Sequence, residues 1–78
     1  MGDRFPSLRG RKMRRILTRL CGAPVRNGRH YKFIGHNDQM FVYGYHDDGE
    51  ISPGMVRSIL VEDVGLSVDE ARREVGGR

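Results

Sequence analysis

The stretch VRNGRHYKFIGHNDQMFVYGY, residues 25–45, decides the fold, because it predicts three short strands in succession. Asn27 and Gly28 tolerate positive φ and predict a two-residue hairpin turn after the first strand. Residues 30–34 form the second predicted strand, and residues 39–45, rich in β-branched and aromatic side chains, form the third. We therefore expect an antiparallel sheet of three strands.

Side-chain alternation divides the second strand between the two faces of this sheet. Tyr31 and Phe33 point to one face, whereas His30, Lys32 and Ile34 point to the other. Amphipathic helices need one sheet face on which to bury their apolar sides, and the aromatic face suits them. The face that carries His30 is then expected to stay open to solvent or to a ligand.

Helical patterns flank the three strands on both sides. Over residues 9–21 the apolar positions recur at i, i+3, i+4, i+7 and i+8, which is the spacing of one helix face. Ser52 is a helix cap followed by a proline, so it begins a second helix. A capping box at residues 67–70 opens a short third helix that ends near residue 75.

The order of these elements predicts a two-layer α+β domain with its helices on one face of the sheet. Residues 9–75 form this single domain, residues 1–8 a loose N-terminal arm and residues 76–78 a frayed tail. Cys21 is the only cysteine, which excludes an intramolecular disulfide and favours a cytoplasmic setting. No apolar stretch has the length of a membrane span, so no membrane is expected.

Charge is distributed unevenly along the chain. Residues 4–37 carry ten lysines and arginines and no acidic residue, whereas residues 38–78 carry nine acids and four arginines. Such polarity favours a polyanionic partner, and we expect RNA phosphates. The alternatives are a solvated helix face and an acidic protein partner; anionic lipid fits less well, because the first helix has few bulky apolar residues. The expected phosphate-binding residues are Arg11, Arg15, Arg19, Arg26, Arg29 and Lys32.

His30 is the strongest candidate for chemistry. It follows the glycine turn in the acid-free segment, with Arg29 and Lys32 as neighbours, and these cations favour the neutral ring that a general base needs. RNA carries its own nucleophile, the 2′-OH, so a histidine base with nearby cations can cleave it without a metal. The ordinary alternative is a partly exposed histidine at a strand edge that takes no part in chemistry.

The other candidate groups give weaker signals. His30, His36 and His46 are separated by six and ten residues, which matches no metal-binding motif, so we expect no metal and no cofactor. His46 is either a second acid–base group or a polar loop residue. Cys21 ends the apolar stripe of the first helix and is expected to be a structural thiol rather than a nucleophile.

The chain resembles the HicA toxins at these positions. Gly28-Arg29-His30 matches the Gly-Ser-His or Gly-Thr-His motif of that family, with an arginine in place of the small hydroxyl residue. The run YHDDGEISPGMVRSIL, residues 45–60, is similar to the family's stretch from a strand-end histidine, here His46, to its second helix. GLSVDEAR, residues 65–72, resembles the usual ending of the family, so the likeness spans about residues 9–74.

HicA toxins are small mRNA interferases, and the resemblance implies a double-stranded-RNA-binding-domain-like fold of the order α-β-β-β-α(-α). It also implies that His30 is the catalytic residue and that a HicB-type antitoxin protein is the partner. We therefore predict the toxin of a toxin–antitoxin pair, a metal-independent endoribonuclease that cleaves mRNA. The alternative is a non-catalytic RNA- or partner-binding module on the same fold. A DNA-binding accessory protein fits less well, because the sequence has no clear recognition helix.

Overall fold

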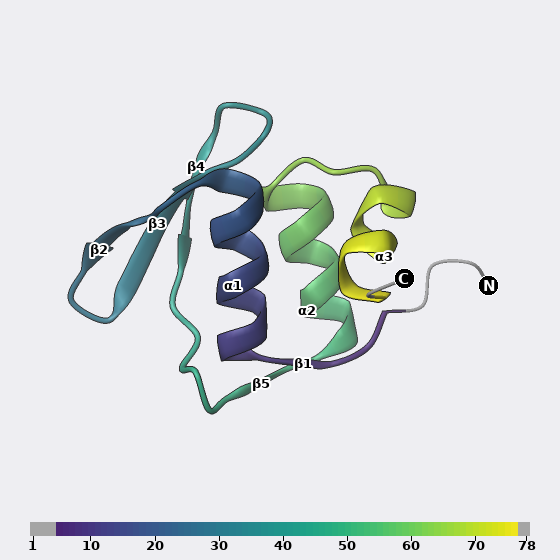
Figure 1. Ribbon diagram of the computed structural model, residues 1–78, viewed down its shortest axis with the longest axis horizontal. Coiled ribbons are helices and arrows are strands. Elements are labelled where there is room, and N and C mark those ends of the chain that lie inside the picture. The colour runs from purple at the N-terminus through teal and green to yellow at the C-terminus, as the bar shows by residue number, and fades with distance from the viewer. Residues whose placement is uncertain (1–4, 77–78) are drawn as a thin grey trace.

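The structure, a computed structural model, describes residues 5–76 and contains three helical regions and two antiparallel sheets (Figure 1). The elements are β1 (Leu8–Arg9), α1 (Gly10–Cys21), β2 (Val25–Asn27), β3 (His30–Ile34), β4 (Met40–Tyr43), β5 (Glu50–Ile51), α2 (Pro53–Arg57), its π-helical continuation η1 (Ser58–Asp63) and α3 (Val68–Gly76). Strands β2, β3 and β4 form one sheet in that order, and β1 pairs with β5 in the other. The predicted α+β fold with a three-stranded antiparallel sheet is confirmed.

The three-stranded sheet has one covered face and one open face. Tyr31 lies opposite Tyr43 and Phe33 opposite Phe41 in the pairing of β3 with β4. Phe33 and Tyr43 are buried in a core that they share with all three helical regions, which Figure 1 shows on one side of the sheet. The predicted division of faces is confirmed, although β4 is shorter than expected and its pairing ends at Tyr43.

The hairpin turn lies one residue later than the sequence indicated. Asn27 pairs with His30, so the two loop residues are Gly28 and Arg29, and the predicted Asn27-Gly28 turn is wrong. Gly28 has a φ of 65°, whereas Arg29 has no positive φ. Glycine at the first of two loop positions is the arrangement of a type II′ turn, which suits the twist of the flanking strands. The shift places Arg29 at the tip of the hairpin.

The ends of two helices follow the capping signals in the sequence. Helix α1 begins at Gly10, within one residue of the prediction, and ends before Gly22, whose φ is 86° and whose N–H donates to the carbonyl of Thr18. At the start of α3 the Ser67 N–H donates to the Glu70 carboxylate at 2.9 Å, and the Glu70 N–H donates to the Ser67 hydroxyl at 3.1 Å. The predicted capping box is therefore confirmed.

The second helix departs from regular α-helical geometry. Ser52 caps α2 as predicted, because its hydroxyl accepts a hydrogen bond from the Met55 N–H at 3.3 Å. In η1 the Val64 N–H donates to the carbonyl of Ile59, five residues earlier, which is the bond of a π-helix. The wider turn brings Val64 round to the face that Ile59 occupies, and both side chains are buried in the core.

The N-terminal segment belongs to the core. Phe5 and Leu8 are 8% and 6% exposed, and Leu8 pairs with Ile51 in the small sheet. The prediction of a loose arm is therefore wrong from Phe5 onward, because burial of these two apolar side chains stabilises the segment. Residues 1–4 of that arm and residues 77–78 of the predicted tail lie outside the described residues. No helix in the described part of the chain is both long and apolar enough to cross a membrane.

Phe5→Ala is expected to lower the free energy of unfolding by about 3 kcal/mol, because it removes a ring that is 8% exposed. Ser7→Ala is the control in the same segment, since its hydrogen bond to Glu50 is exposed, and is expected to cost less than about 1 kcal/mol. Urea unfolding followed by circular dichroism measures both. Equal losses in the two variants would contradict the burial of Phe5.

Candidate functional site

His30 is the first residue of β3, and its ring lies against Gly44 on the open face of the sheet. Tyr31 pairs with Tyr43, so the next step in the same register sets His30 opposite Gly44. A Cβ at Gly44 would lie 2.6 Å from Cδ2 of His30 and 3.0 Å from Nε2. Since side-chain atoms do not pack this closely, the missing side chain at Gly44 makes room for the imidazole ring.

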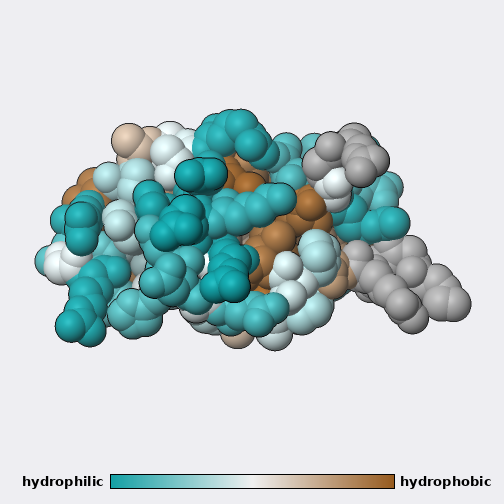
Figure 2. Space-filling model, turned by 60° about the horizontal axis from the view of Figure 1, so that its bottom comes forward, coloured by the Kyte–Doolittle hydropathy of each residue, from teal (hydrophilic) through white to brown (hydrophobic). Residues whose placement is uncertain are grey.

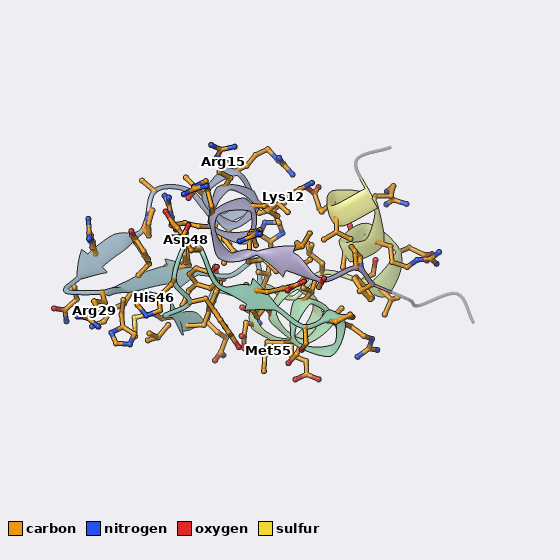
Figure 3. All side chains as sticks on the ribbon, turned by 90° about the horizontal axis from the view of Figure 1, so that it is seen from below. Lys12, Arg15, Arg29, His46, Asp48 and Met55 are labelled. Atoms are coloured by element: carbon orange, nitrogen blue, oxygen red, sulfur yellow. The ribbon has the colours of Figure 1, made fainter. Side chains whose placement is uncertain are left out.

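His46 lies in the loop after β4 and lines a hollow of about 410 Å³. The residues around this hollow, called the hairpin hollow below, are Arg26, Arg29, Tyr31, Tyr45, His46 and Asp47. Figure 3 shows Arg29 and His46 near each other at one end of the molecule. Because His30 rests on Gly44, two residues before His46, the structure brings both predicted histidines and Arg29 to the same end of the sheet.

The first turn of α1 holds the loop that carries His46. The Gly10 N–H donates to the carbonyl of Gly49 at 2.8 Å, and the Arg11 N–H donates to the carbonyl of Asp47 at 3.1 Å. These bonds satisfy amides that have no partner inside the helix. A Cβ at Gly10 would overlap the carbonyl oxygen of His46, so glycine is required for this close approach.

Asp47 and Asp48 in the same loop neutralise part of the basic helix. The Asp47 carboxylate accepts hydrogen bonds from Arg14 at 3.0 and 2.8 Å, and Arg11 lies 4.0 Å from Asp47 and 3.6 Å from Asp48. The hydrogen bond from Arg14 lowers the pKa of Asp47, so this carboxylate stays ionised at neutral pH. The segment that contains no acidic residue in the sequence therefore has two aspartates next to it in the structure.

The outer side of α1 forms a basic groove of about 370 Å³, lined by Arg9, Arg11, Lys12, Arg15, Ile16 and Arg19. Arg19 forms an ion pair with Glu74, whereas Lys12 and Arg15 have no ion pair within residues 5–76. Figure 3 shows Lys12 and Arg15 on the same part of α1. Figure 2 shows that hydrophilic side chains cover much of the hairpin half of the molecule in that view. Lys12 and Arg15 are thus the α1 cations best placed to bind an external anion.

The six predicted phosphate-binding residues are divided between the two sides of the sheet. Lys32 lies on the open face with His30, while the three predicted arginines of α1 belong to the helix layer. Arg26 pairs with Tyr31, so it lies on the covered face as well, and it lines the hairpin hollow together with Arg29 at the turn. A single RNA strand would therefore have to pass around the hairpin end of the sheet to contact both groups.

Sequence reasoning missed Arg14 and Gly44. The Arg14 guanidinium holds Asp47 and also lies 5.6 Å from the centre of the Tyr31 ring, as does the guanidinium of Arg26. Nothing in the spacing of Arg14 distinguishes it from the other arginines of the helix. Gly44 carried a usable signal, because an isolated glycine within a strand pattern indicates the close approach of another group.

The remaining candidates have structural contacts. Nε2 of His36 lies 2.9 Å from the carbonyl oxygen of Leu20, near the end of α1. Cys21 is half-buried, and burial raises the pKa of its thiol, which favours the unreactive protonated form. Within residues 5–76 no group of three histidine, cysteine or acidic side chains is placed to hold a metal ion.

No model of a known protein family matches the chain, and no curated protein or solved structure matches it significantly. The function must therefore be argued from the arrangement of the residues. Imidazole rings can accept and donate protons, and arginines can bind a phosphate. The hairpin end of the sheet provides both kinds of group.

Gly10→Ala is expected to lower the free energy of unfolding by about 2 kcal/mol or more, because its methyl group would overlap the backbone of His46. Gly54→Ala is the matched control. Gly54 lies in α2 with no atom within 4 Å of an added Cβ, so alanine there is expected to be neutral or to stabilise by about 0.5 kcal/mol. Urea unfolding compares the two, and an unchanged Gly10→Ala variant would contradict the close approach.

Proposed function

We propose that this protein is a metal-independent endoribonuclease that cleaves mRNA, the toxin of a HicA-type toxin–antitoxin pair. The supporting observation is the placement of His30, His46 and Arg29 at one end of the sheet, beside a hollow lined by Arg26 and two tyrosines. Cleavage through the 2′-OH of RNA needs a base, an acid and cations that bind the phosphate. This end of the molecule offers all three.

In the proposed reaction, neutral His30 accepts the proton of a 2′-OH. The 2′-oxygen attacks the adjacent phosphorus, and the bond between phosphorus and the 5′-oxygen of the next nucleotide breaks. Protonated His46 donates a proton to that leaving oxygen. The products are a 2′,3′-cyclic phosphate and a free 5′-OH, and no metal takes part.

Arg29 stabilises the negative charge that develops on the phosphate. It lies in the turn directly before His30, and it has no hydrogen bond or ion pair within residues 5–76. A guanidinium can bind two phosphate oxygens at once. The arginine that replaces the small hydroxyl residue of the HicA motif therefore adds a phosphate ligand next to the proposed base.

Exposed apolar side chains on the open face of the sheet favour a protein partner. Its most exposed apolar side chains, each more than half exposed, are Val25, Ile34, Met40 and Val42. The strand register places these side chains around Lys32 on adjacent strands. A contiguous exposed apolar patch is typical of a protein-binding surface. A HicB-type antitoxin bound to this face would also cover His30.

His30→Ala is expected to slow RNA cleavage at least about 100-fold, the lower end of a general base's usual contribution. Gly44→Ala is expected to slow it as well, because its Cβ would displace the His30 ring although its backbone φ is not positive. His36→Gln is the matched control, since His36 contacts the end of α1, and is expected to cleave like the wild type. Gel analysis of labelled RNA with EDTA present, followed by end-group analysis, measures these effects.

The same assay separates the proposal from its alternatives. Equal cleavage by the wild type and His30→Ala would contradict the assigned base, and cleavage that EDTA abolishes would contradict a metal-independent reaction. RNA binding without any product would favour the second candidate function, a non-catalytic RNA- or partner-binding module. In cells, growth arrest on expression that His30→Ala relieves is expected of the nuclease.

Met40→Glu is expected to weaken binding of a HicB-type antitoxin about 30-fold, because a carboxylate would be desolvated within an apolar interface. Met55→Glu is the matched control, since Met55 is an exposed methionine of α2 rather than of the open sheet face (Figure 3). Titration calorimetry measures the affinities. Equal weakening by the two variants would place the antitoxin elsewhere.

A further inference from the structure

The hairpin hollow has the volume of a small ligand site. Its volume of about 410 Å³ lies in the usual range for such sites, and two arginines and two tyrosines border it. We propose that it binds one unstacked nucleotide of a single-stranded RNA, with the phosphate between Arg26 and Arg29 and the base stacked on Tyr45. This inference rests on the proposed function, because it gives a place to the nucleotide beside the cleaved bond.

The two arginines are suited to a phosphate. Nε of Arg26 donates to the carbonyl of Gly28 at 3.1 Å, and its guanidinium lies 5.6 Å from the centre of the Tyr31 ring. These contacts fix the direction of Arg26, and its two terminal nitrogens remain available for a ligand. Arg29 follows Gly28 in the turn, so a phosphate above the turn is within reach of both side chains.

Tyr45 is the ring that a base can reach. The Tyr31 ring has the guanidinium groups of Arg14 and Arg26 close to it, so its surface is largely occupied. Tyr45 is 37% exposed and is supported from behind by Tyr43, whose ring centre lies 5.6 Å away. An exposed aromatic ring on a rigid support is the usual platform for an unpaired base.

The acidic residue in the lining does not oppose an anion. The charge of Asp47 is balanced by Arg14, which holds its carboxylate at 2.8 Å. The hollow therefore keeps the positive charges of Arg26 and Arg29. A base inside a duplex is stacked on both of its faces and cannot lie on Tyr45, so the preferred substrate is single-stranded.

The test uses a fluorescein-labelled hexamer of 2′-O-methyl-adenosine, which lacks the nucleophilic hydroxyl and cannot be cleaved. Fluorescence anisotropy measures its binding to the full chain. Tyr45→Leu, which removes the ring, is expected to weaken binding at least about fivefold, whereas Tyr45→Phe, which keeps it, is expected to stay within about twofold. Binding by Tyr45→Leu that equals the wild type overturns the proposal.

The salt dependence of the same binding tests the phosphate contact. Arg26→Gln is expected to reduce the slope of log Kd against log salt by about 0.7, the value for one phosphate of a single strand. Arg72→Gln is the matched control, because Arg72 lies on α3 beside Asp69, and is expected to leave the slope unchanged. An equal change in both variants overturns the assignment of Arg26.

A second measurement covers a Tyr45→Leu variant that does not fold. Addition of the hexamer to the wild type is expected to shift the amide NMR signals of residues 44–47, and unshifted signals there overturn the proposal.

Experiments with unmodified RNA distinguish failure of the nucleotide subsite from failure of the proposed nuclease. If Tyr45→Leu loses hexamer binding but the wild type does not cleave unmodified RNA, the nucleotide subsite is supported and the nuclease function is contradicted. Wild-type cleavage with an equal kcat/KM in Tyr45→Leu keeps the nuclease and overturns the subsite.

Discussion

The contact between the first turn of α1 and the loop at residues 46–49 joins the helix layer to the sheet at its hairpin end. Both backbone polar groups of Gly10 form hydrogen bonds at this contact. Its N–H donates to the carbonyl of Gly49, and its carbonyl accepts a hydrogen bond of 2.8 Å from the buried Tyr43 hydroxyl. Because Gly10 has no side chain, the backbones of helix and loop touch directly. His46, the end of β4 and the start of α1 all meet at this point of attachment.

Much of the fold could be predicted because its signals are local. The alternation that separates Tyr31 from Lys32 depends on adjacent residues, and it survives in the paired strands. The capping bonds between Ser67 and Glu70 depend on residues three apart in the chain. The open face of His30 also follows from alternation alone, and in the structure its ring lies on that face against Gly44.

The rest depends on contacts between distant residues, which local patterns do not encode. Arg14 and Asp47 are far apart in the sequence, so the charge pattern alone exaggerates how positive the helix is. The turn moved by one residue because pairing of Asn27 with His30 decides the register, and Gly28 fits either turn position. The hairpin hollow was not predictable for the same reason, since it is assembled from the hairpin, the end of β4 and the following loop.

The packing of His30 against Gly44 constrains which residues related chains can have at these two positions. The imidazole ring occupies the space beside Gly44 that a methyl group would need, while the φ of Gly44 itself permits other residues. A related chain that keeps a histidine at position 30 in this geometry is therefore constrained to glycine at position 44. A chain that has lost the histidine is released from that constraint. Covariation of these two positions would thus distinguish relatives that keep the site from relatives that keep only the fold.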